Sequence, residues 1–159
     1  MTADQYVQKL LELSQKKLEG LRHILRYTEE QSDVITEDKI EELEKIIDLK
    51  QQEMNSIDEL DEAFEVYYTR LKSMLGVQSI EEIKMSELAG AAELRQIVTS
   101  IYEMTKQIQN LEIRNNKKLR ESLNQLSAEI RQVKQGQMIN NGYNMGGKMP
   151  QQSYFDQKK

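Results

Sequence analysis

The chain has 159 residues, with 27 acidic and 22 basic side chains and a formal net charge of −5. A length of this order predicts about one domain, and the acidic balance argues against a nucleic-acid partner, which would select a basic surface. The chain has no cysteine, which excludes disulfides and thiolate metal sites. No apolar run approaches the ~20 residues of a membrane-spanning helix, and the N-terminal segment does not resemble a secretory signal. A cytoplasmic protein without stable membrane insertion is expected.

Helix-breaking residues are scarce before residue 136. Only Gly20, Gly76 and Gly90 occur there, and the single proline is Pro150. Because glycine and proline are the strongest local breaks in a helix, nearly continuous helix is expected. The predicted fold class is all-α: a long antiparallel helical hairpin or coiled-coil bundle of about three helices, with a short connecting helix and a flexible C-terminal tail. The bundle is expected over residues 1–135.

The first helix is predicted over residues 3–28. Thr2 and Gln5 have the spacing of a capping box, and the apolar residues that follow lie mostly on heptad spacing, interrupted by the polar Ser14. Residues 29–35 are largely polar and are expected to form a connection, with Thr36 as the N-cap of the next helix.

The second helix is predicted over residues 37–75 by an unusually regular seam. Eleven heptad-spaced positions run from Ile40 to Leu75, and all but Lys50 and Asp61 are apolar. Gly76 is expected to end this helix.

A short helix over residues 80–85 and a long one over residues 88–134 are predicted next. The first follows from the capping-box spacing of Ser79 and Glu82. In the second, the seam spacing becomes four-four-four around Asn115, which is a stutter. Asn115 and Asn116 indicate either a polar layer that sets the register or the point where this helix leaves its partner.

Residues 136–159 differ in composition from the rest of the chain. They hold four of the seven glycines and the only proline, and such a segment buries too little apolar surface to fold alone. A flexible tail is expected there, with isolated apolar anchors that include Tyr143, Tyr154 and Phe155.

No residue pattern in the chain points to catalysis, a metal or a cofactor. His23 is the only histidine and has no cysteine or second histidine to complete a transition-metal site. The acidic cluster over residues 58–62 is expected to be a solvated helix face, and no nucleotide-binding, hydrolase or zinc-protease motif occurs. The protein is therefore not expected to be an enzyme.

The end of the third helix is the best candidate for a binding site. The predicted helices differ in length, so part of the third is expected to extend beyond its partners and expose apolar side chains, which marks a partner site. We define the apolar stripe as the heptad-spaced residues Leu119, Leu123, Leu126, Ile130 and Val133. A second copy of the chain, or the first helix, is the alternative cover for this stripe, so a homo-oligomer remains open.

Charge is segregated along the chain. Residues 29–65 carry a net charge of −12 and residues 105–159 carry +6. If the second and third helices pack antiparallel, the acidic start of one lies near the basic end of the other. The basic stretch around Arg114 and Arg120 is expected to be a solvated helix face rather than a phosphate or membrane contact.

In its whole layout the sequence resembles the FlgN family of flagellar type III export chaperones. The resemblance rests on the N-terminal Leu-rich segment YVQKLLELSQKKLEGLRHILRYTEEQSDVI and on the helix that opens with KIEELEKIIDLKQQEMNSIDELDEAF, where LKQQE is typical. It rests further on the glycine-containing tail NNGYNMGGKMPQQSYFDQKK, whose Tyr143-Asn144 pair and closing FDQKK look like Gram-positive C-termini of the family.

The resemblance implies a cytosolic chaperone that binds the C-terminal helices of the hook–filament junction proteins FlgK and FlgL before secretion. It implies that the C-terminal half binds the client, with Tyr143, Tyr154 and Phe155 contacting either the client or the export gate. Two other classes stay open: a self-associating structural coiled coil, and a helical adaptor for nucleic acid or membrane that uses the basic end of the third helix.

Overall fold

The computed structural model describes residues 1–37, 39–79, 82 and 88–141, with side chains as far as Gln137. Over these residues the chain forms three helices and no strand: α1 (Ala3–Thr36), α2 (Ile40–Leu75) and α3 (Ala91–Asn141). The predicted all-α bundle is therefore confirmed.

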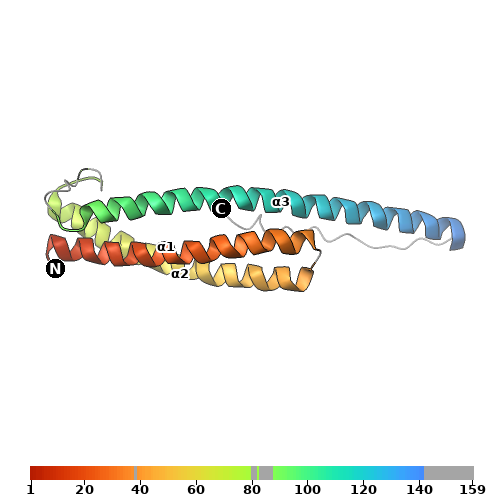
Figure 1. Cartoon of the computed structure of the whole chain (residues 1–159), viewed down its shortest axis with the longest axis horizontal. Coiled ribbons are helices and arrows are strands. Elements are labelled where there is room, and N and C mark those ends of the chain that lie inside the picture. The colour runs from red at the N-terminus through yellow and green to blue at the C-terminus, as the bar shows by residue number, and fades with distance from the viewer. Residues whose placement is uncertain (38, 80–81, 83–87, 142–159) are drawn as a thin grey trace.

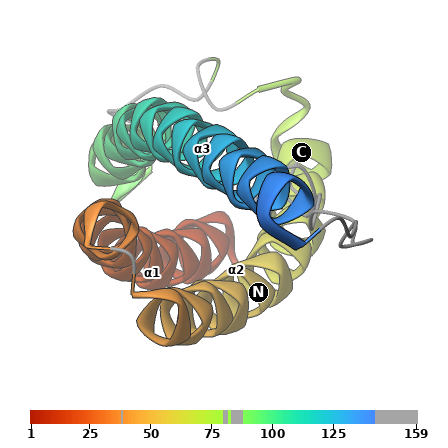
Figure 2. The ribbon, with the colours of Figure 1, turned by 90° about the vertical axis from the view of Figure 1, so that its right-hand side faces the viewer.

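The three helices form an elongated bundle around α1. α1 and α2 run antiparallel and are joined by a short turn, and α3 runs antiparallel to α2 and parallel to α1 (Figure 1). Both α2 and α3 pack along α1, whereas the backbones of α2 and α3 hardly approach each other. Seen along the axis, the three helices form a triangle (Figure 2), and in the side view α3 extends past the other two (Figure 1).

α1 begins as predicted and ends later than predicted. The capping box is present: Gln5 N donates to Thr2 Oγ1 at 3.2 Å, and Thr2 N donates to Gln5 Oε1 at 2.8 Å. The predicted end at residue 28 was wrong, because the polar residues that follow still present a packed face. Thr28 and Gln31 are fully buried, and the acidic residues between them lie on the exposed side.

The predicted N-cap role of Thr36 was also wrong. Thr36 is the last residue of α1, and its hydroxyl donates to the carbonyl of Ser32 one turn earlier, at 3.0 Å. α2 begins at Ile40 after Lys39, which makes no side-chain capping hydrogen bond.

Two glycines with positive φ bound the connection between α2 and α3. Gly76 ends α2 in the left-handed conformation (φ 68°), as predicted, and Gly90 (φ 84°) directly precedes α3. α3 continues to Asn141, past both the predicted end at residue 134 and Gly136. The predicted short helix over residues 80–85 lies, except for Glu82, outside the described residues.

The core consists of three apolar clusters, ordered along α1. The first joins Val7, Leu10, Leu11, Leu71, Ala91 and Leu94. The second joins Leu21, Ile24, Ile57 and Ile108. The third, at the α1–α2 turn, joins Val34, Ile35, Leu43 and Ile46, with Leu119 packed against it.

A polar layer separates the second cluster from the third. Lys50 Nζ, on α2, donates to Gln31 Oε1 on α1 at 2.8 Å and pairs with the carboxylate of Glu112 on α3. Asn115 Nδ2 donates to the carbonyl of Thr28 at 2.9 Å, across the α1–α3 interface. Lys50 and Asn115, both polar interruptions of predicted seams, thus bind α1, which favours the register-setting interpretation. We call Thr28, Gln31, Lys50, Glu112 and Asn115 the polar layer.

Candidate binding surface

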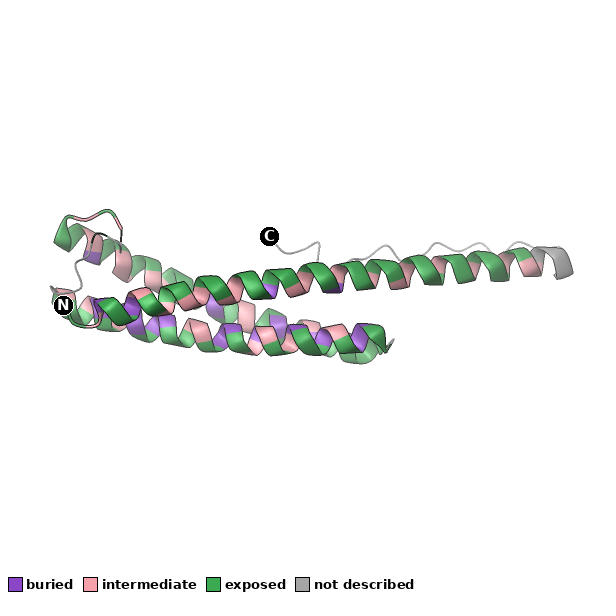
Figure 3. Ribbon diagram, turned by 45° about the horizontal axis from the view of Figure 1, so that its top comes forward, coloured by how far each residue is buried: buried purple, intermediate pink, exposed green. Residues whose placement is uncertain are grey.

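The C-terminal part of α3 extends beyond the α1–α2 turn (Figure 1). The residues that line the hollow between the turn and α3 reach as far as Glu129, and α3 continues to Asn141. At 1.5 Å per residue, residues 130–141 project by on the order of 18 Å. None of residues 116–137 is buried, and Figure 3 shows this part of α3 as exposed or half-buried. The unequal helix lengths therefore leave this part of α3 beyond the ends of α1 and α2, with exposed apolar side chains among its described residues.

The structure divides the apolar stripe between the bundle and the projecting part of α3. Leu119 packs against the third apolar cluster, so it already has an intramolecular contact. Leu123 and Ile130 are half-buried, whereas Leu126 is 45% exposed and Val133 is 55% exposed. The last two are thus the stripe residues with most surface left to cover.

The α1–α2 turn and α3 enclose a pocket of about 260 Å³ beside the stripe. We call it the turn pocket. α3 contributes residues between positions 119 and 129, among them three of the stripe. The turn contributes Val34, Ile35, Thr36, Lys39, Ile40 and Leu43. The sequence analysis did not assign these six residues to a site. It ended the first helix at residue 28 and so placed Val34 and Ile35 in a polar connection. The signal for a packed turn was that these two apolar residues precede the apolar Leu43 across a short, largely polar segment.

The turn is strongly acidic and α3 beside it is basic. Residues 29–45 hold eight acidic and two basic side chains, and residues 114–134 hold six basic and two acidic ones. The carboxylate of Glu37 lies 2.8 Å from the Lys39 ammonium, and that of Glu42 lies 4.0 Å from it. The hydrogen bond to Glu37 and the negative charges of Glu37 and Glu42 raise the pKa of Lys39 above its usual value. One of the two turn lysines is therefore neutralised locally. The charged residues in the lining of the turn pocket are Lys39 and Glu129, and the exposed Glu37 and Glu41 follow the lining residues Thr36 and Ile40 at its rim.

His23 and the acidic cluster of α2 form no convergent site. His23 Nδ1 lies 2.8 Å from Glu53 Oε1 and Nε2 lies 3.4 Å from Glu19 Oε1, on a partly exposed helix boundary. The acidic side chains of this cluster, Asp58, Glu59, Asp61 and Glu62, are exposed. In the part of the chain that the structure describes, no group of three His, Asp or Glu side chains is placed to hold a metal.

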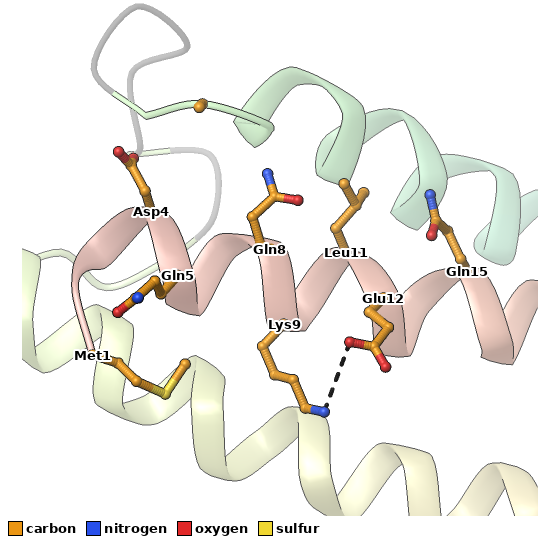
Figure 4. A pocket seen from close by; sticks show the side chains of 9 residues that line it. Met1, Asp4, Gln5, Gln8, Lys9, Leu11, Glu12 and Gln15 are labelled. Atoms are coloured by element: carbon orange, nitrogen blue, oxygen red, sulfur yellow. Dashed lines mark ion pairs between the residues drawn. The ribbon is translucent and has the colours of Figure 1, made fainter.

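A second hollow lies near the N-terminus but does not gather functional groups. Figure 4 shows Gln8 and Leu11 pointing from α1 toward α3, while Lys9 points toward α2. Lys9 Nζ is 3.8 Å from Glu12 Oε2 and 5.9 Å from the centre of the Tyr67 ring. The lining side chains that α1 contributes thus lie on different sides of that helix and do not converge on a ligand.

The expected tail anchors Tyr143, Tyr154 and Phe155 lie outside the described residues. Among the described helices, none combines the length and hydrophobicity needed to cross a bilayer.

Comparison with known protein families identifies a relationship that covers nearly the whole chain. The model of the FlgN protein family matches residues 1–151. Neither the curated proteins nor the solved structures contain a match to the chain. The family match covers nearly the whole sequence, and therefore includes all three helices, the turn pocket and the apolar stripe. The chain therefore belongs to the FlgN family of flagellar export chaperones, whose members bind flagellar proteins.

Proposed function

We propose that this protein binds the C-terminal helices of the hook–filament junction proteins FlgK and FlgL, prevents their premature aggregation in the cytoplasm and presents them for type III secretion. The observation that carries the proposal is the projecting end of α3 in a chain of the FlgN family. Its apolar stripe keeps Leu126 and Val133 exposed, and an amphipathic helix is the natural complement of such a surface.

The exposed stripe residues suit a client that must later be released. Leu126 and Val133 are each about half exposed, so docking of a helix buries part of each side chain, and full burial of such a side chain contributes roughly 1.5–3 kcal/mol. A few such contacts per helix face stabilise a complex without any covalent step. Tyr143, Tyr154 and Phe155 are proposed as further contacts, either to the client or to the export gate.

The test is calorimetric titration of the full chain with a fragment that contains the C-terminal helix of a hook–filament junction protein. We expect stoichiometric binding at micromolar affinity or tighter, with the negative heat-capacity change of apolar burial. In the variant Leu126→Asp/Val133→Asp, two carboxylates enter the apolar contact, and we expect at least a hundredfold weaker binding because uncompensated burial of charge costs several kcal/mol.

The matched control is Val66→Asp/Ile113→Asp. These residues are 47% and 68% exposed, and the substitutions add the same charge on parts of α2 and α3 that line neither the stripe nor the turn pocket. The control is expected to bind like the unmodified chain. Absence of binding by the unmodified chain, together with a stable closed oligomer in light scattering, would support a self-associating coiled coil instead.

A further inference from the structure

We infer that the α1–α2 turn forms the second wall of the client site, and that the turn pocket receives a large apolar side chain at one end of the client helix, next to a basic residue of that helix. This inference rests on the proposed function. It adds to that function the part of the client that is recognised and the residues outside α3 that recognise it.

The size and lining of the turn pocket indicate a side chain rather than a small molecule. Its volume of about 260 Å³ lies below the ~300–1,000 Å³ that is usual for ligand pockets. Val34, Ile35 and Leu43 are buried in its wall, and Ile40 at its rim is 62% exposed. An apolar group that enters therefore contacts a pre-formed apolar surface and covers Ile40.

The turn pocket and the apolar stripe form one continuous surface. Leu123 and Leu126 line the pocket and belong to the stripe, and Ile130 and Val133 follow at four- and three-residue steps along α3. A single helix lying on α3 with anchors at i, i+3/i+4 and i+7 contacts both, with its end at the turn. The pocket thus fixes where along α3 that helix stops.

The acidic charge of the turn favours a basic residue at the end of the client helix that lies beside it. Glu37 and Glu41 are exposed and directly follow the lining residues Thr36 and Ile40 in the sequence, which places two carboxylates at the rim. The ammonium of Lys39, in the lining itself, is paired with Glu37. A basic residue within one turn of the apolar anchor complements this rim. Such a rim pair sets orientation and association rate more than affinity.

Ile40→Gln in the full chain tests the pocket. Ile40 is the first residue of α2 and is mostly exposed, so the variant is expected to keep the melting temperature of the unmodified chain. With the same C-terminal fragment of a hook–filament junction protein as probe, we expect about tenfold weaker binding, as for loss of one large aliphatic contact. Ile113→Gln, which removes an equally exposed isoleucine of α3 away from the pocket, is expected to bind normally.

A second variant, Glu37→Gln/Glu41→Gln, tests the charge. We expect about two- to fivefold weaker binding at low salt, and the difference from the unmodified chain is expected to shrink as salt screens the rim. Equal binding of this variant at all salt concentrations would refute the basic flank.

Other results separate the inference from the proposed function. Normal binding by Ile40→Gln, with loss of binding in Leu126→Asp/Val133→Asp, would overturn the role of the turn and leave the chaperone function standing. Failure of the unmodified chain to bind would overturn the function itself. Tighter binding after removal of residues 142–159, with no remaining effect of Ile40→Gln, would identify the chain's own C-terminus as the occupant and overturn a client side chain. If the chain forms a dimer that Ile40→Gln dissociates, the occupant of the turn pocket is a second copy of the chain. That result would also overturn the client side chain as occupant.

Discussion

Replacement of Lys50 by Met tests whether the polar layer stabilises the bundle. Lys50 has a side chain that is 7% exposed and lies between Gln31 on α1 and Glu112 on α3. Methionine keeps the length of the stem and removes the ammonium, so packing changes little while the hydrogen bonds disappear. The loss of stability therefore reports on the polar contacts.

The magnitude follows from what remains unpaired. Gln31 is fully buried, and its Nε2 already has no hydrogen-bond partner. Lys50→Met also removes the donor to Gln31 Oε1, so the whole side-chain amide of Gln31 is then buried without a partner. One buried unsatisfied group costs roughly 1–3 kcal/mol. The side chain of Glu112 is 24% exposed, and water at that position reduces its share to about 1 kcal/mol or less. We expect Lys50→Met to lower the free energy of unfolding by about 2–3 kcal/mol.

A double variant tests the reasoning. Gln31→Leu removes the stranded amide, so Lys50→Met/Gln31→Leu is expected to regain about 1–2 kcal/mol relative to the sum of the two single variants. Urea denaturation followed by circular dichroism at 222 nm measures all four free energies. A loss below about 0.5 kcal/mol for Lys50→Met, or additive single effects within about 0.5 kcal/mol, would refute a stabilising polar layer.

Two further predictions concern the α2–α3 connection and the surface of α1. Both Gly90→Ala and Gly76→Ala place an L side chain at positive φ, which costs roughly 1–2 kcal/mol. Gly76 has open space, and a Cβ at Gly90 would lie 2.9 Å from Gln8 Nε2, the far end of a flexible side chain that can move aside. Urea melts are therefore expected to show similar losses for the two variants, and a much larger loss for Gly90→Ala would contradict this reasoning. Glu12 accepts a hydrogen bond from Lys16, which lowers the pKa of Glu12 below its ordinary value of 4.5. The pair therefore stabilises the fold above pH 4.5, and this contribution is lost as the pH falls through the folded-state pKa of Glu12. NMR titration is expected to show a higher Glu12 pKa in Lys16→Gln, and an unchanged pKa would contradict the pairing.

The helical class and the packed faces were predictable because they follow from periodic apolar residues. The ends of the helices were harder to predict, because a buried polar residue cannot be distinguished from a surface residue in the sequence. Gln31 was interpreted as part of a polar connection, although it is fully buried and bonded to Lys50. Periodicity continues through such residues, but only a three-dimensional partner shows that they belong to the core.

The candidate site was predictable only on α3. Leu126 and Val133 are apolar positions of a heptad seam on a helix predicted to be longer than the helices it packs against. Both are about half exposed in the structure. The wall formed by the turn requires knowing where α1 ends and which residues of α3 pass beside Ile40. That juxtaposition depends on the register between helices, which heptad spacing alone leaves open because every seven-residue shift preserves it.

The polar layer removes this freedom, and in doing so it determines how much of α3 projects. A shift of α3 by one heptad would move its end by about 10 Å. In one direction, Asn115 would take the place of Ile108 among Leu21 and Ile24, where the second cluster has only apolar side chains. Its amide would then be buried without the carbonyl of Thr28, at a cost of roughly 1–3 kcal/mol. The polar interruptions of the seams thus hold the register in which the turn pocket and the exposed part of the apolar stripe lie side by side.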